Sequence, residues 1–137
     1  MNRVLVTTLI EGSRSSELKI KKLALQILKI LRGKAITLEI FLASPKELKR
    51  FNKKYRNKNR PANVLSFREP KGFFYPDNQK RIGEIFLNIE AVFDKEKLAL
   101  FLVHGILHLF GYEHKTKNGR IRMEKREQSV LLNLSRN

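Results

Sequence analysis

The chain has 137 residues, 42% of them hydrophobic and 9% aromatic, which fits one folded domain over residues 1–137 and excludes a chain kept disordered by charge repulsion. Its 29 Lys and Arg against 13 Asp and Glu give a net charge of +16, so we expect binding to a polyanion such as RNA, DNA or an anionic membrane, with a merely lysine-rich surface as the alternative. The absence of cysteine excludes disulfides and thiolate ligands, so any transition metal must be bound by His, Asp or Glu.

The first segment of the chain predicts a strand followed by a helix. Residues 3–10 are rich in β-branched side chains and predict the strand. Thr7 and Thr8 interrupt this apolar stretch, and no small-residue cleavage site of a signal peptide follows it, so we expect a cytoplasmic protein. The next apolar residues follow helical spacing and predict a helix that ends at Gly33: Leu18, Leu23, Leu25, Ile27, Leu28 and Leu31.

A second strand and a second helix follow. Residues 35–43 alternate apolar and polar side chains and predict the strand. Ser44-Pro45-Lys46-Glu47 combines a capping box with proline at the first helical position, and therefore predicts a helix over residues 45–55. Leu48 and Phe51 of this helix should face the core.

The middle of the chain predicts two further strands separated by a loop. Residues 64–67 form a short apolar run after Pro61, and residues 82–89 form a longer one. The loop over residues 68–81 contains the cluster Phe73-Phe74-Tyr75, with lysines on both sides. These rings can stack on unpaired bases or, as the alternative, pack as a satellite of the core.

Two helices complete the predicted order. Asp94 can cap a helix over residues 95–110, which is apolar nearly all round, should therefore be buried, and ends at Gly111. A last helix over residues 119–134 has a charged side and an apolar side, the latter with Met123, Val130, Leu131 and Leu134. The order β-α-β-α-β-β-α-α predicts the α+β class, as a single domain with a mixed four-stranded sheet packed with helices.

All three histidines of the chain lie within eleven residues, as His104, His108 and His114. Residues four apart on a helix share one face, so His104 and His108 can present two imidazoles to one ion. Gly111 can reverse the chain after the helix and return His114 as a third ligand. Three nitrogens leave the fourth position of a tetrahedral zinc ion open, as in catalytic sites. The alternative, a hydrogen-bonded core residue, would be the preferred interpretation for a single histidine in an apolar helix.

The same spacing occurs in metzincin proteases as His-Glu-x-x-His-x-x-Gly-x-x-His. Position 105 is glycine here, although a protease of that kind has its general base there, so we do not expect peptide hydrolysis by that mechanism. Glycine inside a helix costs about 1 kcal/mol relative to alanine. Gly105 therefore indicates a need for space, either for substrate or for close packing of a neighbouring element.

The sequence around the histidines also resembles a known family. His-Gly-x-Leu-His-Leu-x-Gly-Tyr-[Asp/Glu]-His is similar to the signature of the YbeY family, bacterial metal-dependent endoribonucleases that act in ribosomal RNA maturation. Three upstream segments, residues 51–56, 62–67 and 82–85, extend the resemblance, which covers residues 36–134. Asn63, Glu84 and Glu113 stand where the family has aspartates, and only Asn63 loses the charge.

The resemblance implies that His104, His108 and His114 bind one Zn²⁺, or another divalent transition metal, per chain, and that Arg56 matches an arginine important for activity. The guanidinium of Arg56 follows a capped helix and can bind a phosphate; a solvated surface arginine is the alternative. Glu113 is the second candidate catalytic residue, which can orient an imidazole or accept a proton; the alternative is a surface charge.

We also assign substrate binding to Arg60, Ser66 and Lys71. Arg60 ends the basic segment after the second helix, Ser66 lies in one of the family-like segments, and Lys71 precedes the aromatic cluster.

The sequence thus predicts a zinc-dependent endoribonuclease for single-stranded RNA, acting in maturation of the 16S rRNA 3′ end and in ribosome quality control. Its expected partners are rRNA and the small ribosomal subunit, with no membrane, and the protein is expected to be a monomer. Attack by hydroxide and attack by the 2′-hydroxyl of the RNA both remain open. The alternatives are an amidase-like or peptidase-like zinc hydrolase, which Gly105 and the +16 charge disfavour, and a noncatalytic ribosome-assembly factor whose metal is closed off by a fourth ligand.

Overall fold

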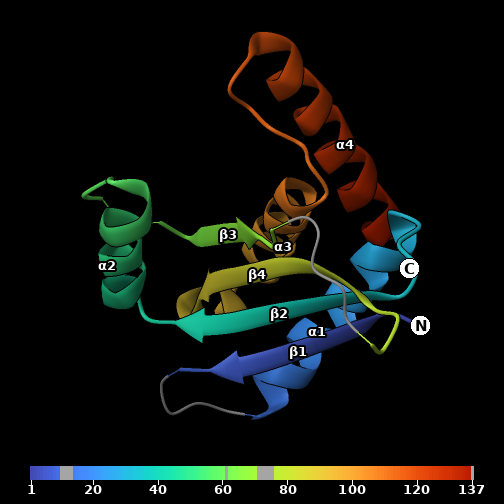
Figure 1. Ribbon diagram of the computed structural model, residues 1–137, viewed down its shortest axis with the longest axis horizontal. Helices are drawn as coiled ribbons and strands as arrows, with labels where there is room; N and C mark the ends of the chain where they lie inside the picture. The colour runs from blue at the N-terminus through green and yellow to red at the C-terminus, as the bar shows by residue number, and fades with distance from the viewer. Residues whose placement is uncertain (10–13, 61, 71–75, 137) are drawn as a thin grey trace.

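The computed structural model describes residues 1–9, 14–60, 62–70 and 76–136, and its elements follow the predicted order (Figure 1). The strands and helices are β1 Arg3–Thr8, α1 Arg14–Ile30, β2 Ile36–Ala43, α2 Pro45–Arg56, β3 Val64–Arg68, β4 Lys80–Asn88, α3 Lys95–Leu109 and α4 Lys117–Ser135. A short 3-10 helix, η1 Ile89–Phe93, was not predicted and connects β4 to α3. No helix among the described residues is long and apolar enough to cross a membrane.

The four strands form one mixed sheet in the order β1-β2-β4-β3. β1 pairs with β2 and β2 with β4 in parallel, whereas β3 pairs with β4 antiparallel, with Val64 opposite Leu87 and Arg68 opposite Gly83. The predicted mixed four-stranded sheet and α+β class are therefore confirmed. β3 is an edge strand, and its position decides what lies beside α3.

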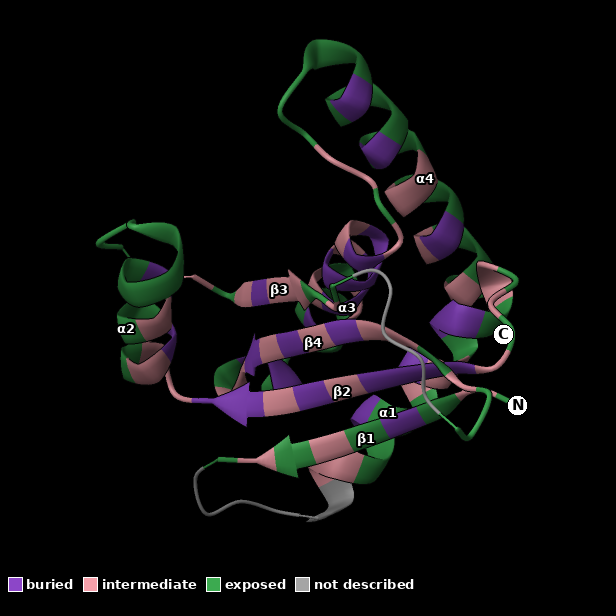
Figure 2. Ribbon diagram, viewed as in Figure 1, coloured by how far each residue is buried: buried purple, intermediate pink, exposed green. Residues whose placement is uncertain are grey.

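The main core lies between one face of the sheet and the helices α1 and α3, which both pack behind the sheet in Figure 1. The buried residues of α3 lie between Leu98 and Leu109, as its apolar sequence predicted, whereas its first turn is exposed, and Figure 2 shows the helix in purple, pink and green. In α1 the buried stripe is Ile20, Ala24, Ile27 and Leu28. Leu18, which the sequence pattern grouped with the apolar face, is 67% exposed because it lies two residues, or about 200°, from Ile20 around the helix.

A smaller apolar cluster on the opposite face of the sheet holds α2. Leu48 is fully buried, and Phe51 packs on the cluster with Phe86 of β4, so the predicted inward face of this helix is confirmed. The Ser44 hydroxyl accepts a hydrogen bond from the Glu47 amide, and the Glu47 carboxylate accepts one from the Ser44 amide. This capping box fixes where α2 begins, and hence where its last residue, Arg56, is presented.

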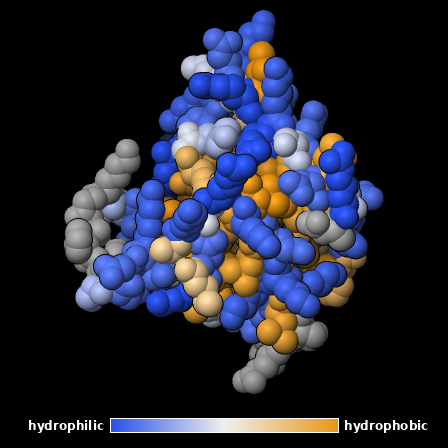
Figure 3. Space-filling model, turned by 90° about the vertical axis from the view of Figure 1, so that its right-hand side faces the viewer, coloured by the Kyte–Doolittle hydropathy of each residue, from blue (hydrophilic) through white to orange (hydrophobic). Residues whose placement is uncertain are grey.

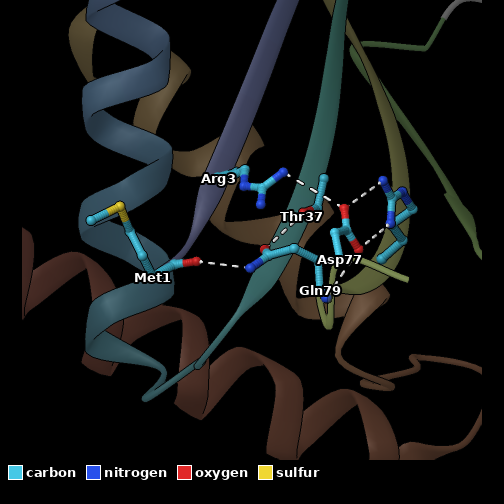
Figure 4. A network of polar contacts seen from close by, with 6 residues as sticks. Met1, Arg3, Thr37, Asp77 and Gln79 are labelled. Carbon is cyan, nitrogen blue, oxygen red and sulfur yellow. Dashed lines mark hydrogen bonds and ion pairs between the residues drawn. The ribbon is translucent and has the colours of Figure 1, made fainter. Parts of the chain in front are cut away.

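A polar network joins the chain start, β2 and the segment before β4 (Figure 4). The Thr37 hydroxyl donates to the Gln79 side-chain oxygen at 2.9 Å, and Arg81 binds the Asp77 carboxylate through two contacts of 3.0 and 3.2 Å. The hydrogen bond from Arg81 is the main reason that the pKa of Asp77 lies below its usual value. The network holds the residues at the start of β4 in place.

The molecular face in Figure 3 is largely hydrophilic, consistent with the high charge of the chain.

Candidate metal centre

The three histidines converge where α3 ends. His104 and His108 lie one turn apart on α3, with ring centroids separated by 4.6 Å. Gly111 has a φ of +104°, and the Tyr112 amide donates back to the Leu107 carbonyl, so the chain reverses as predicted. The reversal places the His114 ring 4.8 Å from that of His108. One potential ligand atom from each histidine lies within 4.8 Å of the others.

Hydrogen bonds to Nδ1 leave the Nε2 atoms of the two helical histidines free to act as ligands. His108 Nδ1 lies 2.9 Å from the Tyr112 carbonyl oxygen, and His104 Nδ1 lies 3.3 Å from the Glu127 carboxylate. Both partners can only accept, so each Nδ1 carries the proton and each Nε2 presents a lone pair. The two Nε2 atoms are 3.1 Å apart. Two lone pairs at this distance repel each other unless a cation lies between them.

The separation of the two helical imidazole nitrogens fits a tetrahedral ion, whereas the candidate ligand atoms of all three histidines spread over up to 4.8 Å. Metal–nitrogen distances of about 2.0–2.1 Å imply ligand nitrogens about 3.3 Å apart, close to the Nε2 separation of 3.1 Å. Burial, followed by the electrostatic effect of the neighbouring His104, lowers the pKa of His108 from 6.5 to about 4, so this imidazole is neutral at pH 7 and available as a ligand. An all-nitrogen set of three imidazoles suits zinc and neighbouring transition metals. Among the described residues, no fourth side chain joins the group.

The histidines lie in a cleft of about 650 Å³ with a strongly cationic lining. Arg56, Arg60, Ser66 and Glu113, four of the residues that the sequence singled out, all line it. Lys71 and the aromatic cluster of residues 73–75 lie outside the described residues. Three charged residues that also line the cleft were not selected from the sequence: Lys58, Arg68 and Glu127.

Arg68 connects the edge strand to the turn that bears the histidines. Its Nε donates to the His108 carbonyl oxygen at 3.0 Å, and its guanidinium forms an ion pair with the Glu113 carboxylate. The Glu113 carboxylate also lies 3.9 Å from His108 Nδ1, next to the site as the sequence suggested. Arg68 was missed because its position depends on the pairing of β3, although its place two residues after Ser66 puts both side chains on one face of the strand.

Gly105 has a packing explanation. A Cβ atom at this position would lie 3.1 Å from both Ser66 Oγ and Val64 Cγ2, and 3.2 Å from Ile85 Cδ1. The Ser66 hydroxyl donates to the Gly105 carbonyl oxygen at 3.0 Å. β3 therefore packs directly against α3 where a metzincin would place its catalytic glutamate. Of the two explanations for Gly105, the structure supports close packing rather than space for substrate.

Comparisons with known proteins identify a matching family, similar sequences and a similar fold. The family model described as endoribonuclease YbeY matches residues 9–135. Similar proteins named endoribonuclease YbeY occur in Buchnera aphidicola subsp. Schizaphis graminum, with 35% identity over 72% of this chain and 66% of the relative, and in Pelagibacter ubique, with 36% identity over 72% and 69%. The chain thus spans about two thirds of the length of these relatives. The solution structure of TM1509 from Thermotoga maritima has the same fold, with a TM-score of 0.51, 22% identity and coverage of 98% of this chain and 93% of that one.

Proposed function

The chain belongs to the family described as endoribonuclease YbeY, and on this premise we propose that it is a metal-dependent endoribonuclease that cleaves single-stranded RNA. One zinc ion per chain, or another divalent transition metal, would be held by His104, His108 and His114. The observation that carries the proposal is the convergence of three imidazoles in an open cleft lined by Arg56 and three other cationic side chains. This combination suits a phosphodiester substrate, which brings its own negative charge.

A divalent ion bound by the histidines would supply Lewis-acid polarisation of the reacting phosphate. Arg56, at the end of α2, lines the same cleft, and its positive charge contributes to the low pKa of His108. Its planar guanidinium can bind two phosphate oxygens and offset the charge that develops on them during cleavage. Arg56 is therefore the proposed catalytic arginine.

The remaining proposed roles belong to Glu113, Arg60, Lys71 and Ser66. Glu113, held by Arg68, is the proposed proton acceptor or orienting carboxylate. Arg60 lines the cleft and is proposed, with Lys71, to bind the RNA backbone. Ser66 donates its hydroxyl hydrogen to Gly105, so towards RNA it would act as a hydrogen-bond acceptor.

By family resemblance we further propose a role in maturation of the 16S rRNA 3′ end and in ribosome quality control. The partners would be rRNA and the small ribosomal subunit, and the protein would act as a cytoplasmic monomer. The net charge of +16 supports an RNA partner.

Two observations weigh against the rival functions. A peptidase of the metzincin type needs a glutamate at position 105, where even a Cβ atom would lie 3.1 Å from side chains of β3 and force them to shift. A purely structural metal is normally enclosed by four protein ligands, whereas only three histidines meet here among the described residues.

The test compares Arg56→Ala with Arg122→Ala, which removes the same charge from an exposed position on α4 that does not line the cleft. Arg56→Ala should retain metal content, thermal stability and most RNA affinity, while single-turnover cleavage of single-stranded RNA falls roughly a hundredfold or more. Arg122→Ala should cleave like the parent. The parent protein should not cleave single-stranded RNA after its metal is removed by a chelator, and the metal-loaded parent should not cleave duplex RNA. Cleavage by Arg56→Ala within a few-fold of the parent would remove the catalytic assignment.

A further inference from the structure

We infer that Glu127 of α4 is a positioning residue of the metal centre, whose carboxylate accepts the Nδ1 hydrogen of His104 and thereby holds Nε2 of that ring towards the ion. The inference rests on the proposed metal site and adds to it a residue from a different helix.

The two helical histidines are held in different ways. His108 donates to the carbonyl of Tyr112, four residues away, so the turn that carries His114 also orients His108. Among the described residues, Nδ1 of His104 has its hydrogen-bonding partner on another helix. This Nδ1 contacts Glu127, 23 residues later in the chain, and the Glu127 side chain is only 14% exposed. A carboxylate this far buried needs a hydrogen-bonding partner, and His104 provides one.

The position of Glu127 follows from the packing of α4. Met123 and Val130 are buried, and Glu127 lies between them at helical spacing, on the side of α4 that faces α3. The start of α4 is also fixed against the metal-binding turn, because a Cβ on Gly119 would lie 2.7 Å from the Glu113 carbonyl oxygen. α4 is thus held both at Gly119 and along its buried residues Met123 and Val130. This packing places the Glu127 carboxylate next to Nδ1 of His104.

This arrangement predicts an effect on metal affinity rather than direct ligation. The carboxylate faces Nδ1, whereas Nε2 of the same ring faces Nε2 of His108. A carboxylate behind a ligand imidazole fixes its tautomer and orientation and increases its basicity, and loss of such a partner typically weakens metal binding by about 10- to 100-fold. A neutral acceptor in the same place should preserve part of this effect.

The experiment measures the Zn²⁺ affinity of the full chain by competition with a chromophoric chelator. The variants are Glu127→Gln, which keeps an acceptor oxygen, and Glu127→Leu, which removes it; Glu124→Gln, at an exposed position on the same helix, is the matched control. We expect about a 10- to 100-fold loss for Glu127→Leu, a smaller loss for Glu127→Gln and no more than a twofold change for Glu124→Gln. The visible spectrum of the Co²⁺-loaded protein should shift for Glu127→Leu, and the melting temperature of metal-free Glu127→Gln should match the parent.

Three outcomes would overturn the inference. The first is Zn²⁺ affinity of both Glu127 variants within threefold of the parent. The second is a fall in Zn²⁺ affinity accompanied by a lower melting temperature of both metal-free variants, which would make Glu127 a structural residue of α4. The third is unchanged affinity with loss of cleavage, which would make it a catalytic group. His108→Ala separates these results from failure of the proposed site, because retained metal in that variant would disprove the histidine site itself.

Discussion

Two glycines near the metal centre offer a test of how tightly β3 is held beside α3. Gly83 and Gly111 both have positive φ values, +142° and +104°. Their surroundings differ completely. A Cβ on Gly83 would lie 2.2 Å from the Phe67 carbonyl oxygen and 2.8 Å from Leu109 Cδ2, whereas a Cβ on Gly111 would meet nothing within 4 Å. Alanine at the two positions therefore imposes similar backbone strain, but only Gly83→Ala adds a collision.

The expected magnitudes follow from these contacts. For Gly111→Ala, the unfavourable backbone conformation costs about 1–2 kcal/mol. For Gly83→Ala, the Phe67 carbonyl must also move away by about 1 Å to restore an ordinary contact, which opens the β3–β4 ladder at the pair formed by Arg68 and Gly83. Loss of two or so hydrogen bonds and of local packing brings the total to about 4 kcal/mol.

Thermal melting of the metal-free proteins, followed by circular dichroism, measures the difference. At this chain length, 1 kcal/mol corresponds to a shift in Tm of about 3–5 °C, so Gly111→Ala should lose about 3–10 °C and Gly83→Ala about 12–20 °C. Gly83→Ala should also weaken Zn²⁺ binding, because the displaced strand carries Arg68, which holds the His108 carbonyl. Melting of Gly83→Ala within 3 °C of Gly111→Ala would refute the close approach of β3.

Further expectations concern the metal, the sheet and RNA. His108→Ala should remove the copurifying metal, which metal analysis checks. In the metal-free state, the free energy of unfolding of the variant should depend less on pH between 6.5 and about 4 than that of the parent, because the unfolded parent takes up a proton at His108 in this range and the folded parent does not. Calorimetry at several pH values measures this difference. Glu84→Gln should raise the Tm at pH 7, because burial and then the charges of Glu39 and Glu69 raise the pKa of Glu84 and so disfavour its ionised form. The gain in Tm should vanish as the pH falls through that raised pKa. An equal gain at low pH would contradict this cause. RNA affinity should fall with salt at a log-log slope of about −0.7 per phosphate contact, and a slope near zero with tight binding would argue against RNA as the reason for the positive charge.

The features that the sequence determined are local ones. The capping box at Ser44 and the Asp94 N-cap fix the starts of α2 and α3 through hydrogen bonds that span two or three residues. Gly111 ends the metal-binding helix because its backbone conformation is intrinsic to glycine. His104 and His108 share a face because helical geometry alone requires it. The element order, the α+β class and the gathering of the histidines all follow from such short-range rules.

The tertiary structure alone decided what surrounds those histidines. The order β1-β2-β4-β3 puts the edge strand beside α3, and this explains both the small residue at Gly105 and the contact of Arg68 with Glu113 across 45 residues. Glu127 reaches His104 only because α4 packs back on α3. A charged residue in a helix or strand gives no local signal of its distant partner, since that partner is set by the packing of whole elements. The ligands were therefore readable from spacing, whereas the groups that orient them depend on long-range contacts.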